Sequence, residues 1–238
     1  MQRLLIASMI GGLVLGGSVL PRMTSSRPLL AASGGAISGK VVLVGDVPKP
    51  KKIEITKDKE KCGADRSAED LVVSPDRGIK NAVVNVLGVK GSAAKLGNPA
   101  LDQKGCGFNP RVTVVPVGGP LDILNSDGIL HNIHTYSKKN NAINKAQPAF
   151  KKKMTETFAQ PEIIKVTCDA HPWMVGWIVV TDHPYVAATD AAGSFKLADI
   201  PAGTHQVEIW HETLGKITKE VTVKAGEETK VTFELSKK

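Results

Sequence analysis

The sequence has few aromatic residues, and no segment shows a sustained helical pattern. Aromatic residues make up 4% of the 238 positions, and Val, Ile and Thr instead carry the segments in which apolar and polar residues alternate. β-Branched side chains fit the pleated surface of a sheet, so this composition favours strands. Apolar residues do not recur at helical spacing, which argues against a helical bundle. We therefore expect an all-β protein.

Long apolar runs are missing except for one near the start. Arg3 is followed by 17 uncharged residues, from Leu4 to Leu20, which is short for a membrane span and is interrupted by four glycines. We interpret residues 1–33 as a signal peptide rather than a permanent anchor. No cysteine directly follows this run, which argues against lipoprotein anchoring. No arginine pair precedes it, which argues against twin-arginine export. The expected location is periplasmic or extracellular, with membrane attachment only if the segment is retained.

Acidic residues are missing from one lysine-rich stretch. Positions 138–155 contain six lysines and no acid, in a chain whose net charge is +8. Clustered charge steers association, so Lys151, Lys152 and Lys153 could dock an acidic partner protein. The alternative is an ordinary solvated loop. No nucleic-acid-binding signature accompanies the lysines, so we expect no nucleic-acid partner.

A seven-residue segment, Cys168-Asp-Ala-His-Pro-Trp-Met174, combines a thiolate, an imidazole and a thioether. These are three of the four ligands of a type 1 copper site, in which a thiolate and two imidazoles bind strongly and a thioether binds weakly. His131 or His134, which follow a polar turn near the start of an expected strand, could supply the second imidazole.

Cysteine is limited to three residues, Cys62, Cys106 and Cys168. In an exported chain two of them can pair and one is left over. If Cys168 is a metal ligand, Cys62 and Cys106 are the natural disulfide. The alternative is that either of them is a free buried thiol. The segment 168–174, which we call the ligand loop, holds a single cysteine. This argues against a dinuclear copper centre with two bridging cysteines.

Short strand-like runs alternate with turn signals along the rest of the chain. The expected strands cover residues 37–44, 52–56, 81–87, 111–117, 121–125, 164–168, 177–181, 205–210, 221–223 and 231–235. The runs 111–117 and 121–125 are separated by Gly-Gly-Pro, which predicts a hairpin. We expect residues 57–78 to form a loop and residues 135–158 to be irregular with a short helix.

Residues 106–182 resemble a cupredoxin, and within that family amicyanin and plastocyanin most. Four motifs in the family's order carry the resemblance, namely Gly107-Phe-Asn-Pro110, Asn125-Ser-Asp127, Leu130-His-Asn132 and Cys168–Met174. The resemblance implies a Greek-key β-sandwich over residues 100–182 that holds one type 1 copper ion. His131, Cys168 and His171 would be the equatorial ligands and Met174 the axial one. Asn132 would brace the site by hydrogen bonding, whereas His134 falls where amicyanin has no ligand.

The C-terminal part resembles a carboxypeptidase regulatory-like, or prealbumin-like, β-sandwich. The resemblance rests on the Asp-x-x-Gly turn within residues 185–195, the segment 197–203 and the alternation of residues 231, 233 and 235. This family opens with a strand like residues 37–43. We therefore expect one domain made of residues 36–90 and 184–236, with the cupredoxin inserted at a loop. Three sequential pieces are the alternative.

Together the resemblances imply an exported electron carrier rather than an enzyme. The expected partners are redox proteins, either a cytochrome or an oxidoreductase, with an acidic surface. The sequence shows no sign of an open coordination position or of a nearby acid–base pair. The alternative is a non-redox copper-binding carrier, or a cell-envelope or carbohydrate-binding module on a cupredoxin scaffold. Trp210 and His211 fall on opposite faces of one strand, which favours packing over a sugar site.

Overall fold

The computed structural model describes residues 34–237, and the expected signal peptide lies outside this range. Strands make up nearly all of the regular secondary structure of these residues, together with one four-residue α-helix and one 3-10 helix, so the all-β prediction is confirmed. Within this part of the chain, no helix has the length and apolar character needed to cross a membrane. The elements are β1 (Gly35–Val44), β2 (Lys52–Ile53), α1 (Lys59–Cys62), β3 (Arg66–Ser67), β4 (Val83–Val86), the 3-10 helix η1 (Ala93–Leu96), β5 (Ala100–Gln103), β6 (Phe108–Asn109), β7 (Val112–Pro116), β8 (Pro120–Asn125), β9 (His131–Thr135), β10 (Asn144–Gln147), β11 (Lys153–Thr157), β12 (Glu162–Thr167), β13 (Val175–Thr181), β14 (Val186–Ala188), β15 (Ser194–Ile200), β16 (Gly203–His211), β17 (Gly215–Val223) and β18 (Glu228–Ser236).

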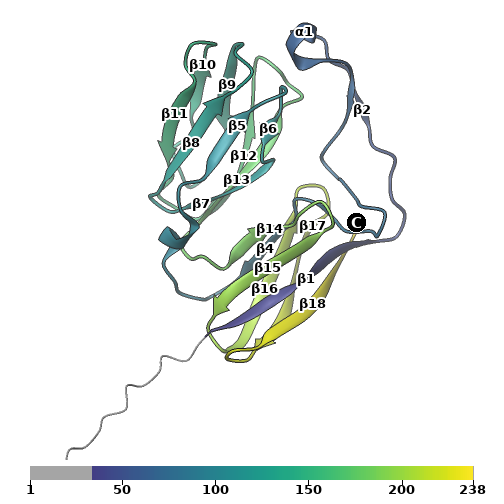
Figure 1. Ribbon diagram of the computed structural model, residues 1–238, viewed down its shortest axis with the longest axis vertical. Helices are drawn as coiled ribbons and strands as arrows, with labels where there is room; N and C mark the ends of the chain where they lie inside the picture. Colours follow the sequence, from purple (N-terminus) through teal and green to yellow (C-terminus); the bar gives the residue numbers. More distant parts are fainter. Residues whose placement is uncertain (1–33, 238) are drawn as a thin grey trace, which may run out of the picture. The chain divides into compact units, whose positions relative to one another are not determined.

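One β-sandwich combines strands from both ends of the described chain, and we call it the terminal sandwich. Its two sheets have the strand orders β15-β1-β18 and β14-β4-β16-β17. Figure 1 shows β1, drawn in purple, beside the yellow β18, and the two strands pair in parallel. Gly39 permits this pairing, because a Cβ there would lie 1.7 Å from the carbonyl oxygen of Val231. Such close backbone approach is one reason for a glycine inside a strand.

The Asp-x-x-Gly turn predicted before β15 is present in the terminal sandwich. The carboxylate of Asp190 accepts hydrogen bonds from the backbone N–H groups of Ala192 and Ser194, at 2.9 and 2.8 Å. Gly193 has a φ of +74°, which a residue with a side chain rarely adopts. The turn therefore leads the chain directly into β15.

A second β-sandwich, which we call the central sandwich, is formed by strands from the middle of the sequence. Its sheets have the strand orders β10-β9-β12-β13-β7 and β11-β8-β5-β6. Leu101 and Ile123 from one sheet pack with Ile133, Ile164 and Ile178 from the other, and all five side chains are fully buried. The burial of Ile164, Val166 and Cys168 agrees with the predicted strand that ends at the cysteine.

The predicted hairpin between residues 111–117 and 121–125 is wrong. β7 pairs with β13 in one sheet of the central sandwich, whereas β8 lies between β11 and β5 in the other. The backbone N–H of Val117 still bonds Thr181, but that of Gly118 bonds Phe158. The short Gly-Gly-Pro connection thus carries the chain across the core. The apolar residues of both strands can then face the same core from opposite sheets.

The helix expected within residues 135–158 is also absent, and the segment forms β10 and β11 instead. β10 extends the sheet beside β9, with Gln147 opposite His131. The Gln147 side chain is fully buried and donates to the backbone carbonyls of Ile123 and Lys151 at 3.1 and 3.0 Å, while it accepts from Gln103 at 2.6 Å. Because this inward-facing residue is polar, the sequence of β10 does not show the alternation of apolar and polar residues that predicts a strand.

Residues 51–67, which we call the cover segment, differ from the expected strand and loop. β2 spans two residues rather than residues 52–56, and it pairs with β3 on either side of α1. Ile55 and Cys62 are buried in the core of the central sandwich, although they fall within the stretch 36–90 that we assigned to the other domain. The cover segment therefore leaves the terminal sandwich and returns to it, as Figure 1 shows for β2 and α1.

Candidate metal centre

The loop after β12 closes tightly and brings its cysteine and histidine together. Its backbone N–H groups bond within the loop, from Met174 to His171 at 2.9 Å and from His171 to Cys168 at 3.3 Å. The N–H of Cys168 returns to the carbonyl of Met174 at 3.3 Å. This arrangement places the Nδ1 atom of His171 3.7 Å from the sulfur of Cys168.

His131, at the start of β9, meets this loop from another strand of the same sheet. Its Nδ1 atom lies 3.0 Å from Nδ1 of His171 and 3.8 Å from Sγ of Cys168. A triangle with these three sides has its equidistant point about 2 Å from each corner, close to the metal–ligand distances of about 2.0–2.1 Å for imidazole and about 2.3 Å for thiolate. The three donor atoms are therefore spaced as a single metal ion requires.

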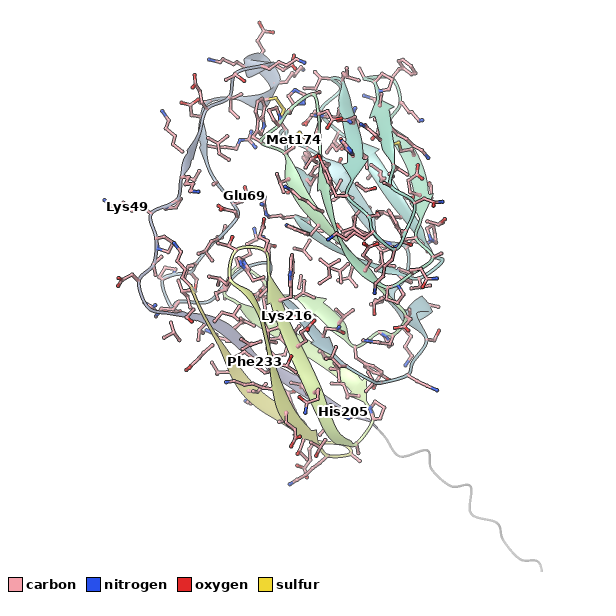
Figure 2. The ribbon with its side chains drawn as sticks, turned by 180° about the vertical axis from the view of Figure 1, so that it is seen from behind. Lys49, Glu69, Met174, His205, Lys216 and Phe233 are labelled. Atoms are coloured by element: carbon pink, nitrogen blue, oxygen red, sulfur yellow. A yellow bond between two sulfur atoms is a disulfide. The ribbon has the colours of Figure 1, made fainter. Side chains whose placement is uncertain are left out.

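The fourth expected ligand, Met174, is buried in the same hydrophobic cluster as Cys168. Figure 2 labels Met174 beside the cover segment. Neither sulfur-bearing side chain is more than 1% exposed, and both histidines are fully buried. All four residues expected to bind copper are therefore excluded from solvent.

Each histidine of this group has a carboxylate on its other ring nitrogen. Nε2 of His131 lies 2.9 Å from Asp127, and Nε2 of His171 lies 2.8 Å from Asp58. A carboxylate accepts a hydrogen bond, so in a neutral imidazole Nε2 carries the proton and Nδ1 carries the lone pair. The two Nδ1 lone pairs then face each other across 3.0 Å. The single S–H of Cys168 can satisfy one of them, so the other lacks a donor unless a cation lies between them.

Burial also sets the protonation of the donor atoms. It lowers the pKa of His131 below its ordinary value, although the hydrogen bond to Asp127 opposes the shift. It raises the pKa of the Cys168 thiol, which the N–H groups of Asn132 and His171 partly offset. Both shifts favour the uncharged forms of these groups in the metal-free protein, and metal binding requires that the thiol lose its proton.

Asn132 contacts the sulfur of Cys168, an expected ligand, directly. Its backbone N–H donates to Sγ of Cys168 at 3.4 Å, and its side-chain oxygen accepts from the N–H of Asp169. Its amide nitrogen donates to the side chains of Asn144 and Asp169, at 2.6 and 3.2 Å. These bonds hold the start of the ligand loop against β9 and β10.

His134, the alternative to His131, lies outside the group of donor atoms. Its Nδ1 atom is 2.9 Å from Asp169, and its ring stacks on Tyr136 with centroids 4.6 Å apart. The side chain is 31% exposed, whereas that of His131 is fully buried. His134 lies three residues after His131 in β9, so its side chain is on the opposite face of the strand, toward the surface.

Cys62 and Cys106 form a disulfide, and Cys168 is a free thiol. The sulfur atoms of the disulfide lie within 4.8 Å of a ring nitrogen of His171. The backbone N–H groups of Gly105 and Cys106 donate to the Asp127 carboxylate at 2.6 and 2.8 Å. The disulfide and the turn beside it therefore pack directly over the ring edges of the histidines.

Two of the six lysines in positions 138–155 have carboxylate partners. Lys145 pairs with Glu156 and Lys153 with Asp122, both at 2.6 Å. Lys151 and Lys152 are exposed beside Phe150, whose side chain is 85% exposed. A positively charged surface remains at these two positions.

Sequence reasoning missed both carboxylates of the centre. Asp127 stands four residues before His131, in a turn noted for its motif, so that spacing was a usable signal. Asp58 is 113 residues from His171 and lies in a segment expected to be an ordinary loop. Nothing local in the sequence links that pair.

Parts of the chain are similar to known proteins. A purple cupredoxin from Nitrosopumilus maritimus is 25% identical with a TM-score of 0.28, covering 32% of this chain and 82% of that one. An amicyanin variant in the Cu(I) state is 19% identical with a TM-score of 0.33, covering 41% and 98%. A copper-containing nitrite reductase from Thermus scotoductus SA-01 is 18% identical with a TM-score of 0.33, covering 59% and 28%. Residues 193–238 match the PEGA domain family. A search of curated proteins found no match.

Proposed function

We propose that the protein is an exported type 1 copper protein that carries single electrons between redox partners. The observation that carries the proposal is the close approach of the Nδ1 atoms of His131 and His171, 3.0 Å apart beside the Cys168 thiol. A soft thiolate with two imidazoles and a nearby thioether is a donor set for copper, since a thioether contributes little to zinc or to hard cations. Bound copper would supply the one-electron step between Cu(I) and Cu(II).

The residues of the centre support electron transfer rather than catalysis. The ligand loop is closed by its own backbone hydrogen bonds, and a carboxylate holds each imidazole by its outer nitrogen. A group held in this way rearranges little when its charge changes. Burial of all four expected ligands excludes water from the centre. We therefore propose a carrier and not an enzyme.

The domain arrangement is part of this proposal. We infer that the central sandwich, residues 100–182, is inserted between the two parts of the terminal sandwich, residues 36–90 and 184–236. The strand orders support this, because β1 and β4 pair only with strands after residue 185 among the described residues. The exported location and the acidic partner belong to the same proposal. The exposed Lys151 and Lys152 support the acidic partner.

The alternative functions have less support. A copper-delivering carrier needs an accessible site, whereas the donor atoms here are fully enclosed. For a carbohydrate-binding module, Trp210 would need to be exposed, but its ring is half-buried and makes a T-shaped contact with Trp177, with centroids 4.8 Å apart.

Copper titration of the metal-free protein tests the proposal. We expect Cu(II) to produce the intense visible absorption of a copper–thiolate bond and the EPR signal of a type 1 site. Cys168→Ser should abolish the absorption, because it removes the thiolate. His134→Gln, a histidine outside the donor group, should leave it unchanged and serves as the control. Copper binding without the absorption would instead favour a non-redox carrier.

A further inference from the structure

The carboxylate that holds His171 comes from the cover segment and not from the central sandwich. Asp58 directly precedes α1, and its backbone oxygen accepts from the N–H groups of Lys61 and Cys62 at 2.9 and 2.8 Å. An aspartate at this position commonly uses its side chain to cap the helix. Here the side chain makes no capping bond and instead reaches Nε2 of His171 at 2.8 Å. The carboxylate is thus directed to the ligand rather than to its own helix.

The cover segment is fixed on both sides of Asp58. On the N-terminal side, Ile55 is fully buried in the core of the central sandwich. On the C-terminal side, Cys62 is bonded to Cys106. The Arg66 guanidinium ties this end further, because it donates to the carbonyls of Cys62 and Cys106 at 2.8 and 3.3 Å. The backbone of Asp58 therefore cannot move far from His171 without breaking a covalent or buried attachment.

This position has two consequences for the ring. The bond to Asp58 fixes the proton on Nε2, so that Nδ1 presents its lone pair to Cys168 and His131. It also places a carboxylate next to an expected ligand, which strengthens the imidazole as a donor to a metal ion. A stronger donor and a nearby negative charge favour the doubly charged Cu(II) over Cu(I). The Asp58 side chain is 39% exposed, so solvent screens part of this effect.

We propose that Asp58, held over the centre by the disulfide-bonded cover segment, is a positioning residue that orients His171 for metal binding and favours Cu(II) over Cu(I). This inference rests on the proposed copper site, but the orientation of the ring is a property of the metal-free protein as well. The two can therefore be tested separately.

The test uses the full chain with Asp58→Asn and Asp58→Ala, and with Glu60→Gln as the matched control. Glu60 is exposed, lies two residues away on the same segment and carries the same charge. The near-ultraviolet circular dichroism and the free thiol content verify that each variant keeps its fold and its disulfide. Asp58→Asn preserves the shape of the side chain, so it remains informative if Asp58→Ala does not fold.

The first measurement is the tautomer of His171 in the metal-free protein, read from its ring nitrogen shifts by NMR. We expect the proton on Nε2 in the wild type and in Glu60→Gln, and a mixture of tautomers in Asp58→Ala. An unchanged tautomer in Asp58→Ala would overturn the inference. Asp58→Asn, whose amide oxygen can still accept from Nε2, is judged by the reduction potential instead. Because no metal is present, this outcome is independent of whether the protein binds copper.

The second measurement is the affinity for Cu(II) and for Cu(I), together with the reduction potential. Loss of a hydrogen bond to a ligating histidine costs roughly 10–100-fold in metal affinity. We expect such a loss for Cu(II), a smaller one for Cu(I) and therefore a higher potential, with Glu60→Gln within about twofold of the wild type. Potentials equal to that of Glu60→Gln would overturn the inference. If the wild type bound no copper, the proposed function would fail, and the tautomer would still decide the role of Asp58.

Discussion

Arg111 and Glu212 form a two-pronged ion pair that joins residues of the central and terminal sandwiches. Nε and one terminal nitrogen of Arg111 donate to the two carboxylate oxygens of Glu212 at 2.6 and 2.9 Å, and the other terminal nitrogen donates to the carbonyl of Val175 at 3.0 Å. Both side chains are about 10% exposed. Arg111 directly precedes β7, and Glu212 directly follows β16. The pair therefore links the start of β13, where the chain leaves the loop from Cys168 to Met174, to the terminal sandwich.

Replacing Arg111 by Met should lower the free energy of unfolding by about 2–3 kcal/mol, somewhat less than the loss of about 3–5 kcal/mol for a fully buried pair. The reason is that Glu212 would keep a poorly solvated charge without its partner. Urea denaturation measures the change. The double variant Arg111→Met/Glu212→Gln should recover part of the loss. Strictly additive effects of the two substitutions would contradict a direct coupling.

Removing the disulfide should destabilise the protein and loosen the cover segment. Cys62→Ala/Cys106→Ala releases a covalent link between positions 44 residues apart, and we expect a loss of about 2–4 kcal/mol in unfolding free energy. Hydrogen exchange at the backbone amides of positions 61 and 62 should speed up more than exchange at the amide of Ile178 in the core. Equal changes at both places would mean that the disulfide supports the whole fold and not the cover in particular.

Stability should fall in mildly acidic solution because of His211. Burial lowers the pKa of this histidine, with Arg111 acting in the same direction and Glu212 and Asp70 opposing it. The unfolded chain then binds more protons than the folded one below about pH 6.5. The stabilisation is complete above that pH and is lost as the pH falls through the folded-state pKa.

The variant His211→Asn isolates this contribution, since its side-chain oxygen can replace Nδ1 as the acceptor for the N–H of Thr213. We expect the stability difference between wild type and variant to shrink between about pH 7.5 and about pH 5. Urea denaturation at several pH values measures it. The other buried histidines contribute equally to both proteins, so parallel pH profiles would rule out His211 as a source.

The exposed lysines beside Phe150 should speed up reaction with anionic redox partners. We expect Lys151→Gln/Lys152→Gln to slow the oxidation of the copper-loaded protein by an anionic complex such as hexacyanoferrate, and to weaken its dependence on ionic strength. Stopped-flow absorbance measures both. Lys219→Gln/Lys230→Gln, which removes two exposed lysines from the terminal sandwich, is the charge-matched control. Equal slowing in both double variants would indicate an effect of net charge rather than of a docking surface.

The sequence predicted the features whose signals are local. The alternation of residues 164, 166 and 168 indicated a strand with an inward cysteine, and the tight spacing from Cys168 to Met174 placed donor side chains on one loop. Features that depend on distant partners were hidden. Gly118-Gly119-Pro120 has the same appearance in a hairpin and in a crossing between sheets, and only the sheet partners of the flanking strands distinguish the two.

Polar groups used inside the fold were the other source of error. Gln147 occupies a buried strand position because Gln103 and two backbone carbonyls satisfy its amide, so the alternation of β10 was lost in the sequence. Asp58 has a role only because the cover segment folds back across the chain. Glutamine and aspartate are usually exposed, so the residue types of Gln147 and Asp58 do not predict their positions in the fold.

The central place of β1 between β15 and β18 also concerns the order in which the protein can assemble. During synthesis the first strand emerges long before residue 194, where its earliest sheet partner begins. All strands of the central sandwich are complete by Thr181. The side chains of the candidate metal centre can therefore come together before β15 and β18 are available to pair with β1. The central sandwich does not need the complete terminal sandwich to begin folding.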